Sequence, residues 1–150
     1  MQRFRSHSEH GLDLKGRLNI PARFREVLRA GYGSEALVIT HWEKCLRAYP
    51  LAEWEALEEL LLEQGKNQPN FGPFVRYVIA GVTECVVDKQ GRILLPPALR
   101  AGVGIEKDVV VVGMLRHFEI WGKAAWDEET ERTRASFADF SAGLATLGIL

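Results

Sequence analysis

The sequence predicts an α+β fold in which two similar halves of the chain interlock into one β-barrel, with helices at its periphery. A thirteen-residue segment occurs twice, at 13–25 and at 88–100. The chain downstream of each copy also follows one pattern, with apolar runs at 37–40 and 109–112. Each half has about 45 residues before its last helix, and a unit of that size does not bury a sufficient core alone. We therefore expect the two halves to share one core.

The two copies of the segment match at an offset of 75 residues. The identical positions are Asp13 and Asp88, Gly16 and Gly91, Arg17 and Arg92, Pro21 and Pro96, and Arg25 and Arg100. The positions that are apolar in both copies are Leu18 and Ile93, Ile20 and Leu95, and Phe24 and Leu99. So many matches at one spacing indicate an internal duplication.

Each copy has a local physical meaning, because it predicts a tight turn, a short strand and then a helix. An Asp at the start of a turn accepts hydrogen bonds from the backbone two residues on, and Gly supplies the positive φ that closes the turn. The apolar alternation that follows is typical of a strand, and Pro suits the first turn of a helix. Four cations consequently lie at or beside the two turns, where they can meet an anion: Lys15, Arg17, Lys89 and Arg92.

In chain order, the first half predicts an edge strand, a short helix, a hairpin and an amphipathic helix. These elements span 4–12, 22–30, 37–40 with 45–49, and about 51–64. Gly31 and Gly33 end the short helix, and the amphipathic helix has one apolar and one acidic face. Trp54 is expected to anchor that helix in the core.

A polar segment rich in turn residues, 65–70, separates the two halves. The second half then predicts a connecting helix, a strand before the second turn, a hairpin and a last amphipathic helix. These span 71–80, 83–87, 109–112 with 118–121, and 123 to about 140. Trp126 corresponds to Trp54, and the apolar tail at 144–150 is expected to fray or to pack on a neighbouring subunit.

Charge is unevenly distributed, although the formal net charge at pH 7 is only −1. Residues 1–29 carry seven Lys or Arg against three Asp or Glu, whereas 51–64 carry five Glu and no cation. This separation predicts one basic and one acidic face. Cys45 and Cys85 suit a reducing compartment, and no apolar run resembles a signal core or a membrane span. We expect a cytoplasmic protein without a membrane partner.

The sequence does not suit an enzyme, because it offers no neighbouring Cys and His and no Gly-rich phosphate loop, and its acids have Arg partners. His7 and His10 are three apart, which on a strand puts them on opposite faces and disfavours a metal pair. We therefore expect no metal site, no cofactor and no small-molecule substrate.

Segments 8–25 and 88–96 together resemble the MraZ family of bacterial transcriptional regulators, and the similarity extends from residue 4 to about 126. The resemblance implies a double-psi or swapped-hairpin, AbrB-like β-barrel. It divides the chain into two SpoVT-AbrB-like repeats (4–54 and 81–126), a helical connector (55–80), and a C-terminal helix and tail (127–150). It also implies a ring-like homo-oligomer, associated with the nucleoid, that binds double-stranded DNA at repeated promoter sites of the division and cell-wall gene cluster.

By the same resemblance, the DNA-contacting surface includes Asp13, Lys15, Gly16, Arg17, Asp88 and Arg92. Two nearby cations, Lys89 and Arg5, are added to it as candidates. The two copies differ at their second and third positions. Lys15 is third in the first copy, whereas the second copy has Lys89 second and Gln90 third. This difference predicts that the two turns contact DNA unequally. Ser6 stands where members of the family usually carry Gly.

Two interpretations of the paired Asp and Arg remain open at this point. Each pair could be a turn-closing ion pair, which at an exposed position contributes about 0–1 kcal/mol. Alternatively, Asp orients a guanidinium whose planar fork suits guanine or phosphate. In that case Arg17 is the first candidate for base contact, Arg92 the second, and Lys15 suits phosphate. Because fold does not determine function, an antitoxin-like interaction module and a structural ring protein are the alternative functions.

Overall fold

The computed structural model describes residues 2–150 and shows a mixed α+β fold. The strands are β1 (His7–Gly11), β2 (Arg17–Asn19), β3 (Ala36–His41), β4 (Leu46–Pro50), β5 (Thr83–Val86), β6 (Arg92–Leu94), β7 (Asp108–Gly113) and β8 (Phe118–Gly122). The helices are α1 (Ala22–Tyr32), α2 (Leu51–Leu60), α3 (Phe71–Phe74), α4 (Pro97–Gly102), α5 (Lys123–Ala135) and α6 (Phe137–Thr146). Two π-helical segments, η1 (Leu61–Gly65) and η2 (Val75–Ile79), extend α2 and α3.

The two halves exchange strands in the main sheet. Within residues 2–150, six antiparallel strands form this sheet in the order β1-β7-β8-β4-β3-β5. The first strand of each half pairs with a strand of the other half, β1 with β7 and β5 with β3, while β4 and β8 pair at the centre. Replacing each strand by its counterpart in the other half (β1 by β5, β3 by β7, β4 by β8, and the reverse) gives the same order read from the opposite edge. The duplication therefore appears as a pseudo-twofold arrangement in which each half completes the other.

From residue 2 to residue 150, the structure does not show the closed β-barrel that the sequence predicted, because its strands form an open six-stranded sheet and a separate two-stranded ribbon of β2 and β6. Strands β1 and β5 are the edges of the main sheet, and β2 pairs only with β6 among the described strands. One further backbone hydrogen bond follows each edge strand, from Leu12 N–H to Lys107 O and from Val87 N–H to Glu35 O, and the Asp13 and Asp88 turns then lead the chain into the ribbon. Beyond the ribbon, Ile20 N–H donates to Gly91 O and Leu95 N–H to Gly16 O, which ties each strand of the ribbon to the opposite turn.

The main core lies between the sheet, the ribbon, α1 and α4, and both halves contribute to it. Leu18 of β2, Ile93 of β6 and residues of β3, β7 and β8 belong to one buried cluster. At its centre Phe4 and Phe24 of the first half contact Phe118 of the second, with ring centroids 5.2–5.4 Å apart. This shared core is what the small size of each half led us to expect.

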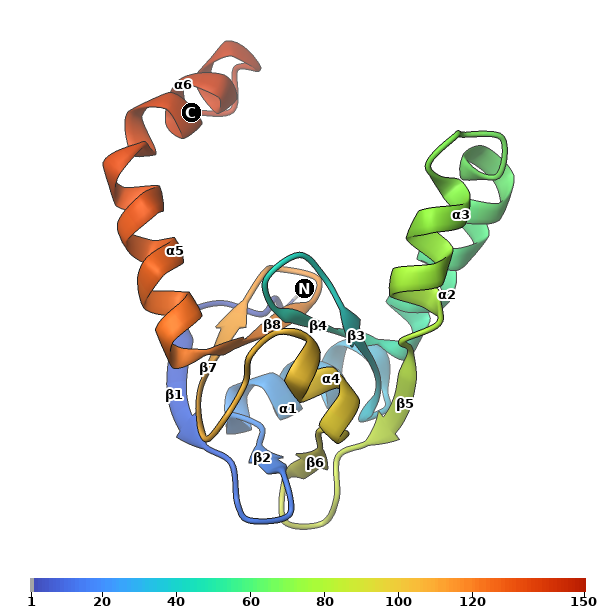
Figure 1. Ribbon diagram of the computed structural model, residues 1–150, viewed down its shortest axis with the longest axis vertical. Helices are drawn as coiled ribbons and strands as arrows, with labels where there is room; N and C mark the ends of the chain where they lie inside the picture. Colours follow the sequence, from blue (N-terminus) through green and yellow to red (C-terminus); the bar gives the residue numbers. More distant parts are fainter. Residues whose placement is uncertain (1) are drawn as a thin grey trace.

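Two helical arms extend from the side of the main sheet that lies away from the ribbon (Figure 1). The first arm comprises α2, η1, α3 and η2, and the second comprises α5 and α6. Trp54 anchors the first arm, since it is buried against Tyr49 with ring centroids 5.2 Å apart. Trp126 holds the second arm against Trp121, at 5.9 Å.

The last helix differs from the prediction, because α5 ends and α6 begins around Ser136, whose φ of −113° and ψ of 14° depart from helical values. Large apolar side chains of α6 and the tail are exposed, including Phe137, Phe140, Leu144 and Leu147. Packing of the tail on a neighbouring subunit stays a prediction. Among the described residues, no helix is both long enough and apolar enough to cross a membrane.

Ser6 has a left-handed backbone conformation, with φ of 66°. It lies between Phe4, which enters the core and bridges to Leu115, and the start of β1. The Gly113 N–H donates to its carbonyl at 2.8 Å, which helps to hold this bend. A left-handed φ explains physically why Gly is the residue expected at this position.

Candidate nucleic-acid interface

Each repeated turn is built around its Asp. Asp13 Oδ1 accepts the N–H groups of Lys15 and Arg17, both at 2.9 Å. Asp88 Oδ1 accepts those of Gln90 and Arg92 at the same distance. The predicted turn chemistry is therefore confirmed in both copies, and the glycines that close the turns have φ of 82° and 83°.

Both turn carboxylates are ionised at neutral pH. The pKa of Asp13 is lowered to about 2, first by the backbone hydrogen bond from Arg17 and further by its guanidinium, while partial desolvation opposes the shift. The pKa of Asp88 is lowered as well, with the backbone hydrogen bond from Arg92 as the largest cause. Each Asp can therefore orient a guanidinium without losing its charge.

The two turn arginines have different surroundings. Arg17 Nε donates to Asp13 Oδ2, and its side chain is 34% exposed. Arg92 Nε donates to Asp88 Oδ2 at 3.2 Å, and its Nη2 donates to Gln90 Oε1 at 2.7 Å. The side chain of Arg92 is only 23% exposed, so Arg17 is more accessible to a ligand.

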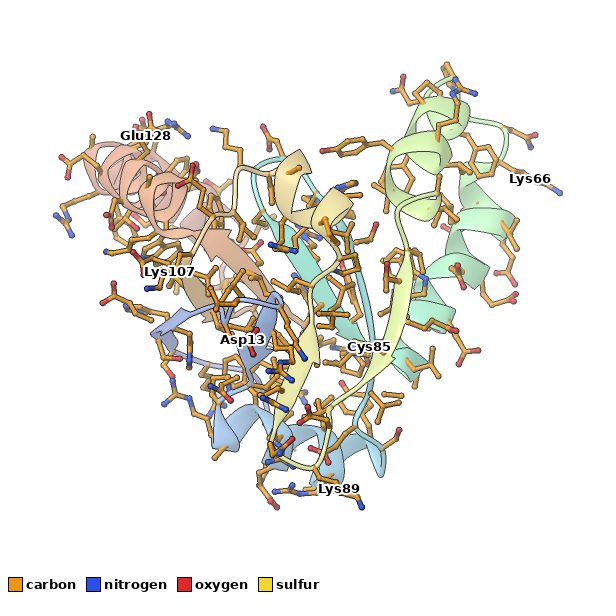
Figure 2. All side chains as sticks on the ribbon, turned by 60° about the horizontal axis from the view of Figure 1, so that its bottom comes forward. Asp13, Lys66, Cys85, Lys89, Lys107 and Glu128 are labelled. Carbon is orange, nitrogen blue, oxygen red and sulfur yellow. The ribbon has the colours of Figure 1, made fainter. Side chains whose placement is uncertain are left out.

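The ribbon brings the two turns side by side. Its register pairs Arg17 with Leu94 and Asn19 with Arg92, and Arg92 Nη1 lies 4.0 Å from Asp13 Oδ2 across it. Both turns project away from the arms (Figure 1). Figure 2 turns this side forward: it labels Asp13 on the first turn and Lys89 on the second, and Lys66 and Glu128 mark the arms. Of the predicted residues, this surface gathers Asp13, Lys15, Arg17, Asp88, Lys89 and Arg92, and Gly16 is buried beneath it.

The closing arginine of each copy lies against the turn of the other copy. A Cβ on Gly16 would lie 3.0 Å from Arg100 Cζ, and one on Gly91 would lie 2.8 Å from Arg25 Nη1. Arg25 Nε also donates to Glu35 Oε1 at 2.9 Å, and Arg100 Nε to the Leu95 carbonyl at 3.0 Å. Neither arginine is among the site residues that the sequence predicted. The signal for them in the sequence was that both copies of the segment end in Arg.

Arg5 does not lie with the turns. Arg5 precedes β1 and the first turn follows β1, so the five residues of this strand separate Arg5 from the turn. Its side chain instead lines a groove of about 330 Å³ together with Arg3, Arg23 and Glu26. This is a second cationic surface, distinct from the one that carries the turns.

The ribbon also presents two side chains that were not predicted to be part of the site. Leu18 and Ile93 are buried, and the residues on either side of each face outward. Asn19 and Leu94 are consequently exposed beside the arginines of the turns. The alternation of the strand was the signal for them, but it does not show which face meets solvent.

Both cysteines are free thiols, Cys45 buried and Cys85 partly buried. Burial raises the pKa of the Cys45 thiol strongly and that of Cys85 to about 11, so neither forms a thiolate readily. Within residues 2–150, no cluster of three or more His, Cys, Asp or Glu side chains could hold a metal ion.

Comparison with known proteins connects this arrangement to a family. The family model described as "MraZ protein, putative antitoxin-like" matches residues 4–70 and again 78–146. The chain is 44% identical over 146 residues to "Transcriptional regulator MraZ" of Syntrophobacter fumaroxidans, covering 97% of both chains. It is 47% identical over 126 residues to the protein of that name from Desulforapulum autotrophicum, covering 84% of both. The protein of that name from Pediococcus pentosaceus is 40% identical over 146 residues, which is 97% of this chain and 99% of its own.

The two matched segments support the internal repeat, and the relatives cover nearly the whole chain. Both the doubled turn and the overall length therefore agree with one family, and this chain belongs to the MraZ family.

Proposed function

We propose that this protein is a transcriptional regulator that binds double-stranded DNA sequence-specifically through its two turns and the ribbon between them. One observation carries the proposal: two turns, each with an arginine held by an ionised Asp, lie side by side on a surface away from the arms. The names of the relatives, which are transcriptional regulators, support it.

The ribbon has a shape suited to the major groove of DNA, which admits a two-stranded β-ribbon. Arg17 is the first candidate for a bidentate contact with guanine O6 and N7, and Arg92 the second. Lys15 and Lys89 lie at exposed positions of the turns and suit phosphate contacts, which position the protein without selecting a sequence. Arg100 adds positive charge behind the turns, whereas the charge of Arg25 is paired with Glu35. Arg5 would contact DNA only through its separate groove.

We extend the proposal to the assembly and its target. A single chain offers few cations, and a homo-oligomer can raise affinity by about a hundred to ten thousand times when several sites engage together. A ring-like homo-oligomer on repeated promoter sites of the division and cell-wall gene cluster fits this requirement. The exposed apolar side chains of the second arm supply a candidate contact between subunits. Such a regulator would act in the cytoplasm, on the nucleoid.

We also propose that the architecture is the AbrB-like swapped-hairpin type, with repeats at 4–54 and 81–126, a connector at 55–80, and a C-terminal helix and tail at 127–150. The exchange of β1 and β5 between the halves supports this assignment. An antitoxin-like interaction module is the second candidate, which the family description favours. The doubled turn in one chain favours DNA binding over it.

A footprint on the DNA immediately upstream of the protein's own gene tests the function. Wild-type protein should protect repeated sites there, and Arg17→Ala should lower affinity for them by about 10- to 100-fold. Lys66→Ala removes an equal charge from the first arm and should leave the footprint unchanged. Light scattering on each variant counts the subunits and shows whether assembly is intact. Protection that survives in Arg17→Ala at wild-type affinity would count against the assigned surface.

A further inference from the structure

Positions 19 and 94 correspond in the duplication, but they carry different side chains. Each is the last residue of its strand and follows a buried apolar residue, Leu18 or Ile93. Each is exposed on the outward face of the ribbon, and the Leu94 side chain is 54% exposed. The two backbones are therefore equivalent, and only the side chains distinguish the two ends of the ribbon.

The antiparallel register gives each turn arginine a different neighbour. Leu94 is directly opposite Arg17, and Asn19 is directly opposite Arg92. Directly opposed residues of an antiparallel pair have Cβ atoms about 4.5–5.5 Å apart on the same face. Any base pair contacted by Arg17 is thus next to an isobutyl group, and any contacted by Arg92 is next to a carboxamide.

These two side chains suit different base edges in the major groove. A carboxamide accepts from adenine N6–H and donates to N7 at the same time, whereas an aliphatic group contacts the 5-methyl group of thymine. An isobutyl group offers guanine or cytosine no hydrogen bond, and a carboxamide gains little from a methyl group. The chemistry therefore differs between the two ends although the fold is pseudo-twofold.

We propose that Asn19 and Leu94 are specificity-determining residues, with Asn19 contacting an adenine beside the Arg92 site and Leu94 a thymine methyl beside the Arg17 site. The inference rests on the proposed DNA-binding function and deepens it. A symmetric ribbon would favour a palindromic site. This ribbon makes the site recognised by one chain asymmetric, so that it has a direction along the DNA.

DNA duplexes that lack one thymine methyl group or one adenine N7 acceptor test the inference. In the footprinted site, each thymine is replaced in turn by deoxyuridine, which lacks only the methyl group, and each adenine by 7-deazaadenine, which lacks the N7 acceptor. Fluorescence anisotropy gives the affinity of each duplex for wild type, Leu94→Ala and Asn19→Ala. One uridine should weaken wild-type binding about fourfold and leave Leu94→Ala unaffected. One 7-deazaadenine should weaken wild-type binding about tenfold and leave Asn19→Ala unaffected.

Leu62→Ala is the matched control, because Leu62 is 55% exposed on the first arm. It should respond to every modified duplex as wild type does. Unchanged wild-type affinity for all modified duplexes, or equal sensitivity in wild type and both ribbon variants, would overturn the inference while leaving DNA binding in place. Failure of the wild-type protein to bind the unmodified duplex would overturn the proposed function itself.

Discussion

Arg17 and Arg92 occupy matching positions of a duplicated segment, yet their side chains differ in freedom. Arg92 is engaged by Asp88 and Gln90 and lies near Asp13, whereas Arg17 is held by Asp13 through Nε. The second copy has Gln90 where the first has Lys15, and this produces the difference. The amide oxygen of Gln90 accepts a hydrogen bond from the guanidinium, which the ammonium group of Lys15 cannot do. Unequal turns were predicted from this position, and their unequal contribution to DNA binding stays a prediction.

Arg92→Ala should reduce DNA affinity less than Arg17→Ala does. We expect about a tenfold loss or less for Arg92→Ala against about 10- to 100-fold for Arg17→Ala, because the guanidinium of Arg92 is less exposed and already has Gln90 as a partner. Titrations of both variants on the same duplex measure the difference. Gln90→Lys should raise affinity above wild type, since it frees Arg92 and adds a cation. Equal losses in the two alanine variants would contradict the prediction.

In each turn a glycine is needed both for the backbone conformation and for the close approach of another side chain. Gly16 and Gly91 have positive φ, which L side chains adopt only at a cost, and both are buried beneath an arginine of the other copy. The sequence predicted the positive φ, because the spacing of Asp and Gly is local. It did not predict the arginines, since their approach depends on how the two strands of the ribbon cross.

Gly16→Ala should lower the free energy of unfolding by about 1–2 kcal/mol, because a non-glycine residue at positive φ is strained and the new Cβ would press on Arg100. Urea denaturation followed by circular dichroism measures the change. Gly31→Ala is the control, because Gly31 lies in α1 with open space around its Cβ position. This control should instead be stabilised by about 0.4–1 kcal/mol. Equal stability of the Gly16 variant and wild type would contradict this account of the turn.

The partly buried side chain of His117 should make the stability of the fold depend on pH. His117, just before β8, stacks on Tyr49 of β4 with ring centroids 4.7 Å apart. Burial, and secondarily the charge of Arg47, lower the pKa of His117 to about 4 from its usual value of 6.5. Because the pKa in the folded state is the lower one, the neutral ring stabilises the fold above pH 6.5. That stability is lost as pH falls towards 4.

We therefore expect the urea midpoint of wild type to fall between about pH 7 and pH 5, and that of His117→Phe to fall less. Burial also lowers the pKa of His10, so the variant should keep a smaller dependence of the same sign. The Asp13 carboxylate titrates only near pH 2, which keeps its contribution outside this window. A variant with the full wild-type dependence would show that His117 is not its source.

The whole molecule separates a cationic surface from two helical arms, and the first arm carries the acidic helix α2. A chain of net charge −1 can bind a polyanion only if its cations are gathered in this way. Binding should then depend on phosphate contacts at the turns and should be sensitive to salt.

Affinity for the duplex should fall by about tenfold between 50 and 200 mM salt for each chain bound, if Lys15 and Lys89 each neutralise one phosphate. Anisotropy titrations at several salt concentrations give the slope. Lys15→Ala should make the slope shallower by about one, whereas Lys44→Ala, which removes an exposed cation paired with Glu129 of the second arm, should not change it. A flat titration would exclude an interface built on phosphate contacts.

The sequence by itself determined most of the elements and the two turns, because these depend on interactions between residues close in the chain, but it did not predict the division of the last helix at Ser136. It also determined that the halves need one another, since each is too small for a core. Only the tertiary structure decided that β1 pairs with β7 and β5 with β3, that Arg25 and Arg100 reach the opposite turns, and that Asn19 and Leu94 face outward. The physical reason is the duplication itself. The apolar runs at β3 and β7 are alike, so either could pair with β1, and the choice depends on loops and packing across the whole molecule.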